Sequence, residues 1–151
     1  MSLEPAESRR DFFVCVVFVI ERDGQVLLLK RSRTKDHAAG EWETGSGGIL
    51  SGETPQAAVI REAKEETGLD IEPAALIDAF HFYRGVERRE TIGISFHCRA
   101  HTGEVTLSDE HEEAKWVPIE ALATGPYPDW MRRAGATIRA GGGASAGGSG
   151  G

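Results

Sequence analysis

Apolar residues near the start of the chain gather in two adjacent runs, residues 12–20 and 26–30. Both runs are short and rich in β-branched or leucine side chains, which is typical of buried strands. The segment between them ends in Asp23-Gly24, a pair that readily adopts the positive φ angles of a tight turn. The pattern therefore predicts a β-hairpin. Because the first run is too short to span a bilayer and leads into a charged turn, it indicates neither a signal peptide nor a membrane span.

A helical pattern follows in the second third of the chain. Thr54 is a good N-cap, the proline after it suits the first helical position, and Gly68 suits the left-handed position that ends a helix. We expect this helix to pack on a sheet through the small or apolar side chains of Ala57, Ile60 and Ala63. Its charged residues then lie on another side.

Strand patterns return after the helix, at residues 75–83 and 91–100. The second of these alternates, so that one face carries apolar side chains and the other polar ones. The apolar face comprises Ile92, Ile94, Phe96 and Cys98, and the polar face comprises Thr91, Ser95, His97 and Arg99. An acidic loop at residues 108–113 precedes a short strand at Trp116-Val117, a helical turn that ends at Leu122 and a last helix at residues 128–139.

The two ends of the chain have compositions that support no packed core. Residues 1–10 are polar, and residues 141–151 contain only glycine, alanine and serine, so we expect both segments to be flexible. The length between them suits one domain, which we place at residues 11–140.

Composition narrows the range of partners. The 151 residues carry a formal net charge of −7, which argues against a nucleic-acid polymer as partner but leaves room for a small phosphorylated ligand. Cys15 and Cys98 lie inside apolar runs and are too few for a disulfide framework. We therefore expect reduced, buried thiols in a cytoplasmic protein.

Three glutamates are the strongest chemical feature of the predicted helix. Glu62, Glu65 and Glu66 are spaced so that they lie close together on its surface, where like charges repel. A hard divalent cation removes that repulsion and prefers oxygen ligands. The cluster therefore predicts a magnesium or manganese site.

The residues around this cluster complete a longer pattern. A glycine, five residues, Glu, seven residues, Arg-Glu, two residues, Glu-Glu, one residue and Gly-Leu run from position 47 to position 69. This resembles the signature of the Nudix hydrolases, which include the MutT-like phosphohydrolases, and every defining position matches. The resemblance covers about residues 11–125 and implies an α/β (α+β) fold, a Nudix-type α/β/α sandwich with a mixed β-sheet.

The resemblance also implies an activity and a set of roles. Nudix hydrolases cleave the pyrophosphate of a nucleoside diphosphate linked to another group, such as a nucleotide, a sugar or ADP-ribose, with Mg²⁺ or Mn²⁺. By this resemblance the metal is held by Glu62, Glu65, Glu66 and the carbonyl of Gly47. Arg61 and Glu53 correspond to the pair that holds the glycine loop against the helix. The family resemblance is also compatible with a homodimer.

The general base is left between two positions. Glu65 lies in the helix, and Glu110 lies in the acidic loop, at a place from which many family members supply a further acid. Glu112 and Glu113 compete with Glu110 for that role.

Two further features of the sequence bear on which activity the family resemblance implies. Ser46 stands where the family often has proline, which changes the stiffness of the loop and not its chemistry. The segment from Lys30 to Trp42 also resembles isopentenyl diphosphate isomerases, which share the fold but need a cysteine in the loop after the tryptophan. That loop has none here, so isomerisation is disfavoured. A non-catalytic nucleotide-binding module of the same fold is the other alternative, and it would be expected to lose some of these glutamates.

Overall fold

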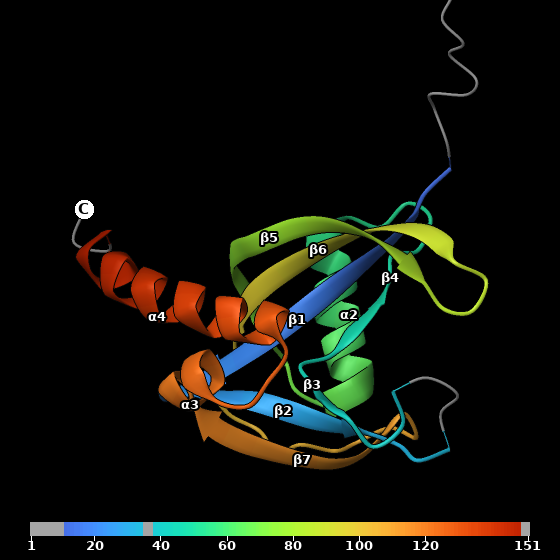
Figure 1. Cartoon of the computed structure of the whole chain (residues 1–151). Coiled ribbons are helices and arrows are strands. Elements are labelled where there is room, and N and C mark those ends of the chain that lie inside the picture. Colours follow the sequence, from blue (N-terminus) through green and yellow to red (C-terminus); the bar gives the residue numbers. More distant parts are fainter. Residues whose placement is uncertain (1–10, 35–37, 149–151) are drawn as a thin grey trace, which may run out of the picture.

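A computed structural model describes residues 11–34 and 38–148 of the chain, which form one mixed α and β unit (Figure 1). The predictions for residues 1–10 and 149–151 lie outside the described residues. Along the chain the elements are β1 (Phe13–Arg22), β2 (Gln25–Arg31), β3 (Trp42–Glu43), β4 (Ser46–Gly48), α2 (Pro55–Thr67), β5 (Glu72–Arg84), β6 (Arg89–Arg99), β7 (His111–Pro118), α3 (Ile119–Thr124) and α4 (Asp129–Gly148).

The predicted hairpin is confirmed. β1 and β2 are antiparallel, and Asp23 and Gly24 between them have φ angles of 52° and 79°. Two consecutive positive φ angles give the turn the twist that the flanking strands require. Beside the turn the two strands pair directly, with Arg22 opposite Gln25.

Away from the turn, β1 and β2 diverge. β1 pairs with β4, where Cys15 lies opposite Gly48, and β2 pairs with β3 and β7. On its other side β1 runs parallel to β6, which pairs with the antiparallel edge strand β5. The sheet is thus mixed, and it opens from the hairpin turn toward the glycine segment of β4 (Figure 1).

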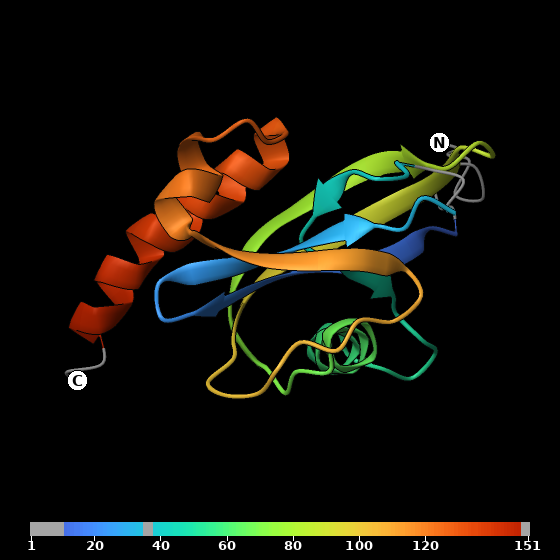
Figure 2. The ribbon, with the colours of Figure 1, turned by 90° about the horizontal axis from the view of Figure 1, so that it is seen from below.

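Helices cover both faces of this sheet, as the sandwich architecture requires. Figure 2 shows α2 end-on along one side, with α3 and α4 on the other. Alternate residues of β1 serve the two cores, since Val16 and Phe18 pack on the α2 side and Val19 packs on the α4 side. Strand β1 is buried on both faces, which explains why its sequence is a continuous apolar run.

The ends of α2 are those that the sequence predicts, but its packing face is different. Thr54 Oγ1 accepts from the Ala57 N–H at 3.1 Å, and Gly68 has a φ of 75°. The buried positions of the helix are Ala58, Val59, Ala63, Glu66 and Thr67. Ala57 and Ile60 are exposed, so the packing face predicted from the sequence was wrong at those two positions. The helix is turned such that Glu66 faces inward.

Other elements differ from the prediction mainly at their ends. β5 begins at Glu72 and β7 begins at His111, so the last part of the predicted acidic loop is a strand. Pairing with β2 extends this strand, because β2 offers a partner at each position from Gln25 to Arg31. The last helix continues to Gly148, whereas the sequence predicts a flexible tail from Gly141. No proline interrupts this segment.

β6 alternates as predicted, with Phe96 and Cys98 in the α2-side core. On its polar face Thr91, Ser95 and His97 are buried as well, since the strand lies between β1 and β5, whereas Arg99 is partly exposed. His97 on that face contacts Glu21 of β1, with Nε2 and Oε1 2.6 Å apart.

The two cysteines are as expected, buried and not joined to each other. Burial raises the pKa of the Cys98 thiol to about 12 and also raises that of Cys15. Both therefore stay protonated at neutral pH. Within the part of the chain that the structure describes, no helix is long and apolar enough to cross a membrane.

Candidate active site

The glycine segment and α2 meet at one close contact. A methyl group added at Gly47 would lie 2.0 Å from Cδ of Glu62, a separation that no Cβ tolerates. Gly47 belongs to β4 and Glu62 to the second turn of α2, so the missing side chain is what lets the helix carboxylate reach the strand backbone. Two residues assigned to one site from the sequence are thus brought together.

Arg61 ties the loop to the helix. Its Nε and Nη2 donate to the two carboxylate oxygens of Glu53 at 2.7 and 2.9 Å, and Nη2 also donates to the Gly48 carbonyl at 2.9 Å. Glu53 in turn accepts from the Leu50 N–H at 2.9 Å. The Arg61 hydrogen bond, helped by that from Leu50, lowers the pKa of Glu53 to about 2. Such two-pronged pairs fix geometry well, which supports the expected holding role of both residues.

Glu62 and Glu65 also approach this guanidinium, but unequally. Arg61 Nη1 donates to Glu62 Oε1 at 2.8 Å, while its shortest distance to the Glu65 carboxylate is 3.4 Å. The Glu65 side chain is 58% exposed, against 14% for Glu62. Glu62 is therefore the better fixed of the two.

Glu66 is the unusual member of the cluster. Its side chain is only 4% exposed, and neither carboxylate oxygen has a hydrogen-bond partner among the described residues. Burial, together with the nearby carboxylates of Glu62, Glu110 and Glu43, raises the pKa of Glu66 to about 10. The surroundings disfavour the ionised form of this carboxyl group, and a positive charge placed beside it would favour that form.

These donors fit a hard divalent cation in chemical kind. Glu66 offers two buried oxygens without partners, and Glu62 lies beside it against the backbone of Gly47. Oxygen ligands of this type suit Mg²⁺ and Mn²⁺. In the described part of the chain, however, no three carboxylate, imidazole or thiol groups already converge into a complete metal cage. The side chains that would complete it include Glu65, which points to Arg61.

The three glutamates at the end of the acidic loop and the start of β7 lie in different surroundings. The charge of Glu110 acts on Glu66, so Glu110 lies on the side of the buried carboxylate. Its backbone is held in place because the Ser32 N–H donates to the Glu110 carbonyl at 2.9 Å. Glu112 and Glu113 instead form ion pairs with Lys30, at 3.7 and 3.1 Å. Of the three, Glu110 is the one placed near the site.

Sequence reasoning missed a row of polar groups behind Glu66, of which His111 is buried and Glu43 and Arg31 are partly buried. Glu43 Oε2 lies 3.1 Å from Arg31 Nη1 and 2.9 Å from His111 Nε2. Nδ1 of the same histidine faces Glu66 Oε1 at 3.8 Å. Burial alone would raise the pKa of Glu43, but the hydrogen bonds from His111 and Arg31 outweigh it and hold the pKa below its usual range. Glu43 is therefore a carboxylate, and the only hint of this row in the sequence was the position of His111 next to Glu110.

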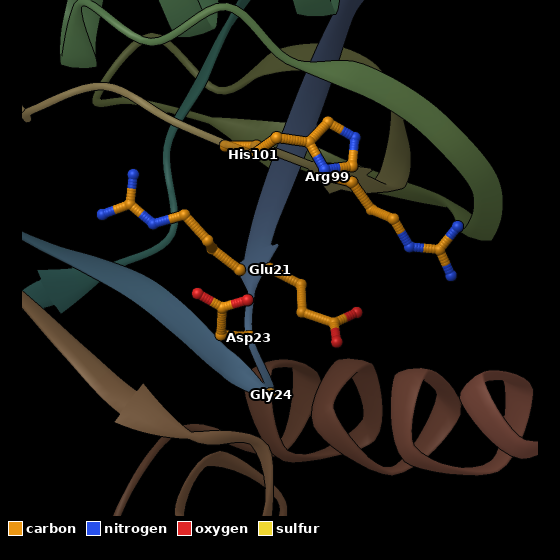
Figure 3. A pocket seen from close by; sticks show the side chains of 7 residues that line it. Glu21, Asp23, Gly24, Arg99 and His101 are labelled. Carbon is orange, nitrogen blue, oxygen red and sulfur yellow. The ribbon is translucent and has the colours of Figure 1, made fainter.

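A cavity lies at the opposite end of β1, beside the hairpin turn (Figure 3). Its lining residues are Glu21, Arg22, Asp23, Gly24, Arg99, Ala100 and His101. Six residues of strand, or about 20 Å, separate Glu21 from Cys15, which pairs with the glycine segment. The cavity measures about 210 Å³, less than the roughly 300 Å³ at which ligand pockets usually begin. It is not part of the carboxylate site.

Comparison with known proteins bears directly on this arrangement. A sequence model of the NUDIX domain matches residues 10–138. The chain is 30% identical over 125 residues to nucleoside triphosphatase NudI of Enterobacter sp. (strain 638), which covers 77% of this chain and 87% of that protein.

Nudix hydrolase 5 of Arabidopsis thaliana is 32% identical over 113 residues, which are 73% of this chain. The chain spans only 37% of the length of that plant protein. Among solved structures, the MutT protein from Methanosarcina mazei Go1 superposes with a TM-score of 0.71 at 28% identity, over 93% of this chain and 99% of that one.

Proposed function

The chain belongs to the Nudix hydrolase family, and we propose that it hydrolyses the pyrophosphate bond of a nucleoside diphosphate linked to a further group, with Mg²⁺ as cofactor and Mn²⁺ as a substitute. One observation carries this proposal. Glu66 is a buried carboxyl group without a partner, beside Glu62 and behind a glycine strand, and a cation beside such a group would favour its ionised form.

The holding residues prepare the site for a charged substrate. Arg61 joins Glu53 of the loop to Glu62 of the helix, so the loop backbone and the metal-binding side chains keep one geometry. Gly47 leaves room for Glu62 and would add its carbonyl to the ligand set. A bound divalent cation supplies charge neutralisation for the phosphate oxygens and an activated water. The protein residues would hold it through Glu62, Glu66 and Glu65.

Two glutamates remain as proton acceptors for the attacking water. Glu110 is exposed and lies on the side of Glu66, and its carboxylate can accept a proton without disturbing the loop anchor. Glu65 is also exposed, but its carboxylate lies 3.4 Å from the Arg61 guanidinium and is directed toward the loop anchor. We therefore propose Glu110 as the general base.

The substrate is proposed at the level of a chemical class. NudI, by its name, acts on nucleoside triphosphates, which are nucleoside diphosphates linked to a further phosphate. This supports a nucleotide with a diphosphate or longer phosphate chain. The net charge of −7 supports a small substrate over a nucleic-acid polymer. We further propose that the protein acts in the cytoplasm, and that a homodimer is the assembly to test first.

A substrate panel tests the activity. The purified chain is incubated with nucleoside triphosphates, nucleotide sugars, dinucleotides and ADP-ribose plus Mg²⁺, and the products are identified by mass. We expect cleavage within a phosphate chain, loss of cleavage in a chelator and recovery when Mg²⁺ is restored. Glu104→Gln, at an exposed position outside the site, is the control and should behave as the wild type.

Two other outcomes would contradict the proposal. Binding of nucleotides without cleavage of any of them would favour the non-catalytic module. Interconversion of isopentenyl and dimethylallyl diphosphates would favour an isomerase, although both cysteines of the chain are buried and have raised pKa values.

A further inference from the structure

His111 stands out among the buried groups that the proposed mechanism does not use. Its side chain is 1% exposed, at the start of β7, and it lies between two carboxyl groups from different parts of the fold. One ring nitrogen, Nε2, is 2.9 Å from Glu43 of β3, and the other, Nδ1, faces Glu66 of α2. The imidazole, on β7, thus lies between the short strand β3 and the helix that carries the acidic cluster.

The side of His111 toward Glu43 is fully engaged. Because the Glu43 carboxylate can only accept hydrogen bonds, Nε2 of His111 is the donor of that pair. Arg31 on β2 holds the same Glu43 oxygen at 3.1 Å, so the carboxylate cannot turn away. The ring plane and the direction of Nδ1 are therefore set by residues of three adjacent strands.

The side toward Glu66 is not engaged in the same way. Nδ1 and Glu66 Oε1 are 3.8 Å apart, which is too long for a hydrogen bond, and neither has a partner among the described residues. Buried polar atoms without partners are rare, and each requires an explanation such as a strained site, a functional role or a bound ion. A histidine needed only to tie strands together would not have to aim its second nitrogen at an unpartnered carboxyl group.

We propose that His111 is a positioning residue that fixes the Glu66 carboxyl group for cation binding, and that Glu43, held by Arg31, orients His111 for this role. This inference rests on the proposed function for the identity of the cation. Groups behind the ligands of a metal site commonly orient those ligands, and their loss costs about 10- to 100-fold in metal affinity. Here the orienting group would come from the strands and the ligand from the helix.

The chain supplies a matched control in its second buried histidine. His97 Nε2 pairs with Glu21 Oε1 at 2.6 Å, and its side chain is 7% exposed. Glu21 lies at the hairpin end of β1, away from the acidic cluster. The side-chain amide of glutamine can donate a hydrogen bond in place of histidine Nε2, but glutamine has no atom that corresponds to Nδ1. His111→Gln and His97→Gln therefore make the same chemical change in two places.

The test is direct Mn²⁺ binding to the metal-free protein, followed by electron paramagnetic resonance, with folding checked by circular dichroism. We expect His111→Gln to raise the Mn²⁺ dissociation constant about 10- to 100-fold, and His97→Gln to leave it close to the wild-type value. Glu43→Gln alone should weaken binding, and its effect should be smaller in the His111→Gln background than in the wild type, because part of it passes through the imidazole.

Each outcome decides the inference. Wild-type Mn²⁺ affinity in a folded His111→Gln variant would overturn it, and so would an equal loss in His97→Gln. If His111→Gln does not fold, Glu43→Gln carries the test, and unchanged affinity in that variant would overturn the inference. The readout is metal binding and does not depend on turnover. A wild-type protein that binds Mn²⁺ but cleaves no substrate would contradict the proposed function, while the Mn²⁺ affinities of the variants would still test the role of His111.

Discussion

The two ends of strand β1 carry similar groups but differ in what those groups leave unsatisfied. At the hairpin end, His97 and Glu21 satisfy each other at 2.6 Å, and the cavity beside them is lined by both acids and bases. At the glycine end, His111 and Glu43 form a pair at 2.9 Å, but Glu66 behind them has two buried oxygens without partners. A buried histidine–glutamate pair therefore signals a site only where it adjoins an uncompensated group.

The divergence of β1 and β2 explains this difference. At the turn the two strands hydrogen-bond to each other, so the sheet is closed there. At the other end each strand has a new partner, and the helix can bring carboxylates into the space between the two parts of the sheet. We expect changes at the glycine end to affect activity and changes at the hairpin end to affect stability.

The largest effect should come from the acidic loop at the glycine end. Glu110→Gln removes the proposed proton acceptor and should lower kcat by about 10²- to 10⁴-fold. Glu113→Gln, which breaks only a surface ion pair with Lys30, should leave kcat close to that of the wild type. Steady-state kinetics on the best substrate of the panel measures both. Equal losses in the two variants would show that the loop is needed as a whole and that Glu110 has no special role.

Replacing one glycine by alanine at each end of β1 should give the next largest effect. Gly47→Ala would drive a methyl group into Glu62, and such a displacement of a catalytic group can cost about 10²-fold in rate. Gly24→Ala meets no atom within 4 Å but must adopt a φ of 79°, at a cost of about 1–2 kcal/mol in stability. Activity and thermal unfolding are measured for both. An equal loss of activity in Gly24→Ala and Gly47→Ala would contradict the assignment of activity to the glycine end and of stability to the hairpin end.

Glu21→Gln tests the hairpin end by itself. The change weakens the bond to a buried imidazole and should lower the free energy of unfolding by about 1–3 kcal/mol. The variant should keep wild-type kcat under conditions where it is folded, because the pair has no contact with the acidic cluster. Urea unfolding and kinetics measured on one preparation separate the two quantities. A fall in kcat without a fall in stability would place this end in the reaction.

The smallest effect concerns the loop anchor in acid. Bonding to Arg61 lowers the pKa of Glu53 to about 2, so its contribution to stability is complete above the ordinary carboxyl pKa of 4.5 and is lost as the pH falls toward 2. The melting temperature of the wild type should therefore fall more steeply between pH 5 and about 2.5 than that of Glu53→Gln. Parallel curves for the two proteins would mean that the Arg61 pair contributes no net stability.

Local signals in the sequence were sufficient for much of the fold. The Asp23-Gly24 turn and the two caps of α2 each depend on a few adjacent residues, and all are where the sequence predicts them. Element ends were less predictable. β7 begins at His111 because β2 offers a partner there, and that partner is remote in the sequence.

The site was predicted as far as its residues share a motif. The spacing of the acidic cluster and its Arg61 anchor lies within one helix and one loop, so the pattern already contains the geometry. It could not show that Glu66 is buried while Glu65 is exposed, because that depends on how the helix is turned against the sheet. The motif also could not show the contact between Glu43 and His111, because these two residues come from different strands.

The most direct test of the central claim is the Mg²⁺ dependence of turnover in the wild type and in Glu66→Gln. Glutamine is as neutral as the carboxyl group whose pKa is raised to about 10, so the variant should fold without difficulty. We predict that the wild-type rate rises from near zero in a chelator to a plateau with Mg²⁺, and that the folded variant shows no such activation. A rate that does not depend on Mg²⁺ in the wild type, or an identical Mg²⁺ response in Glu66→Gln, would contradict the account.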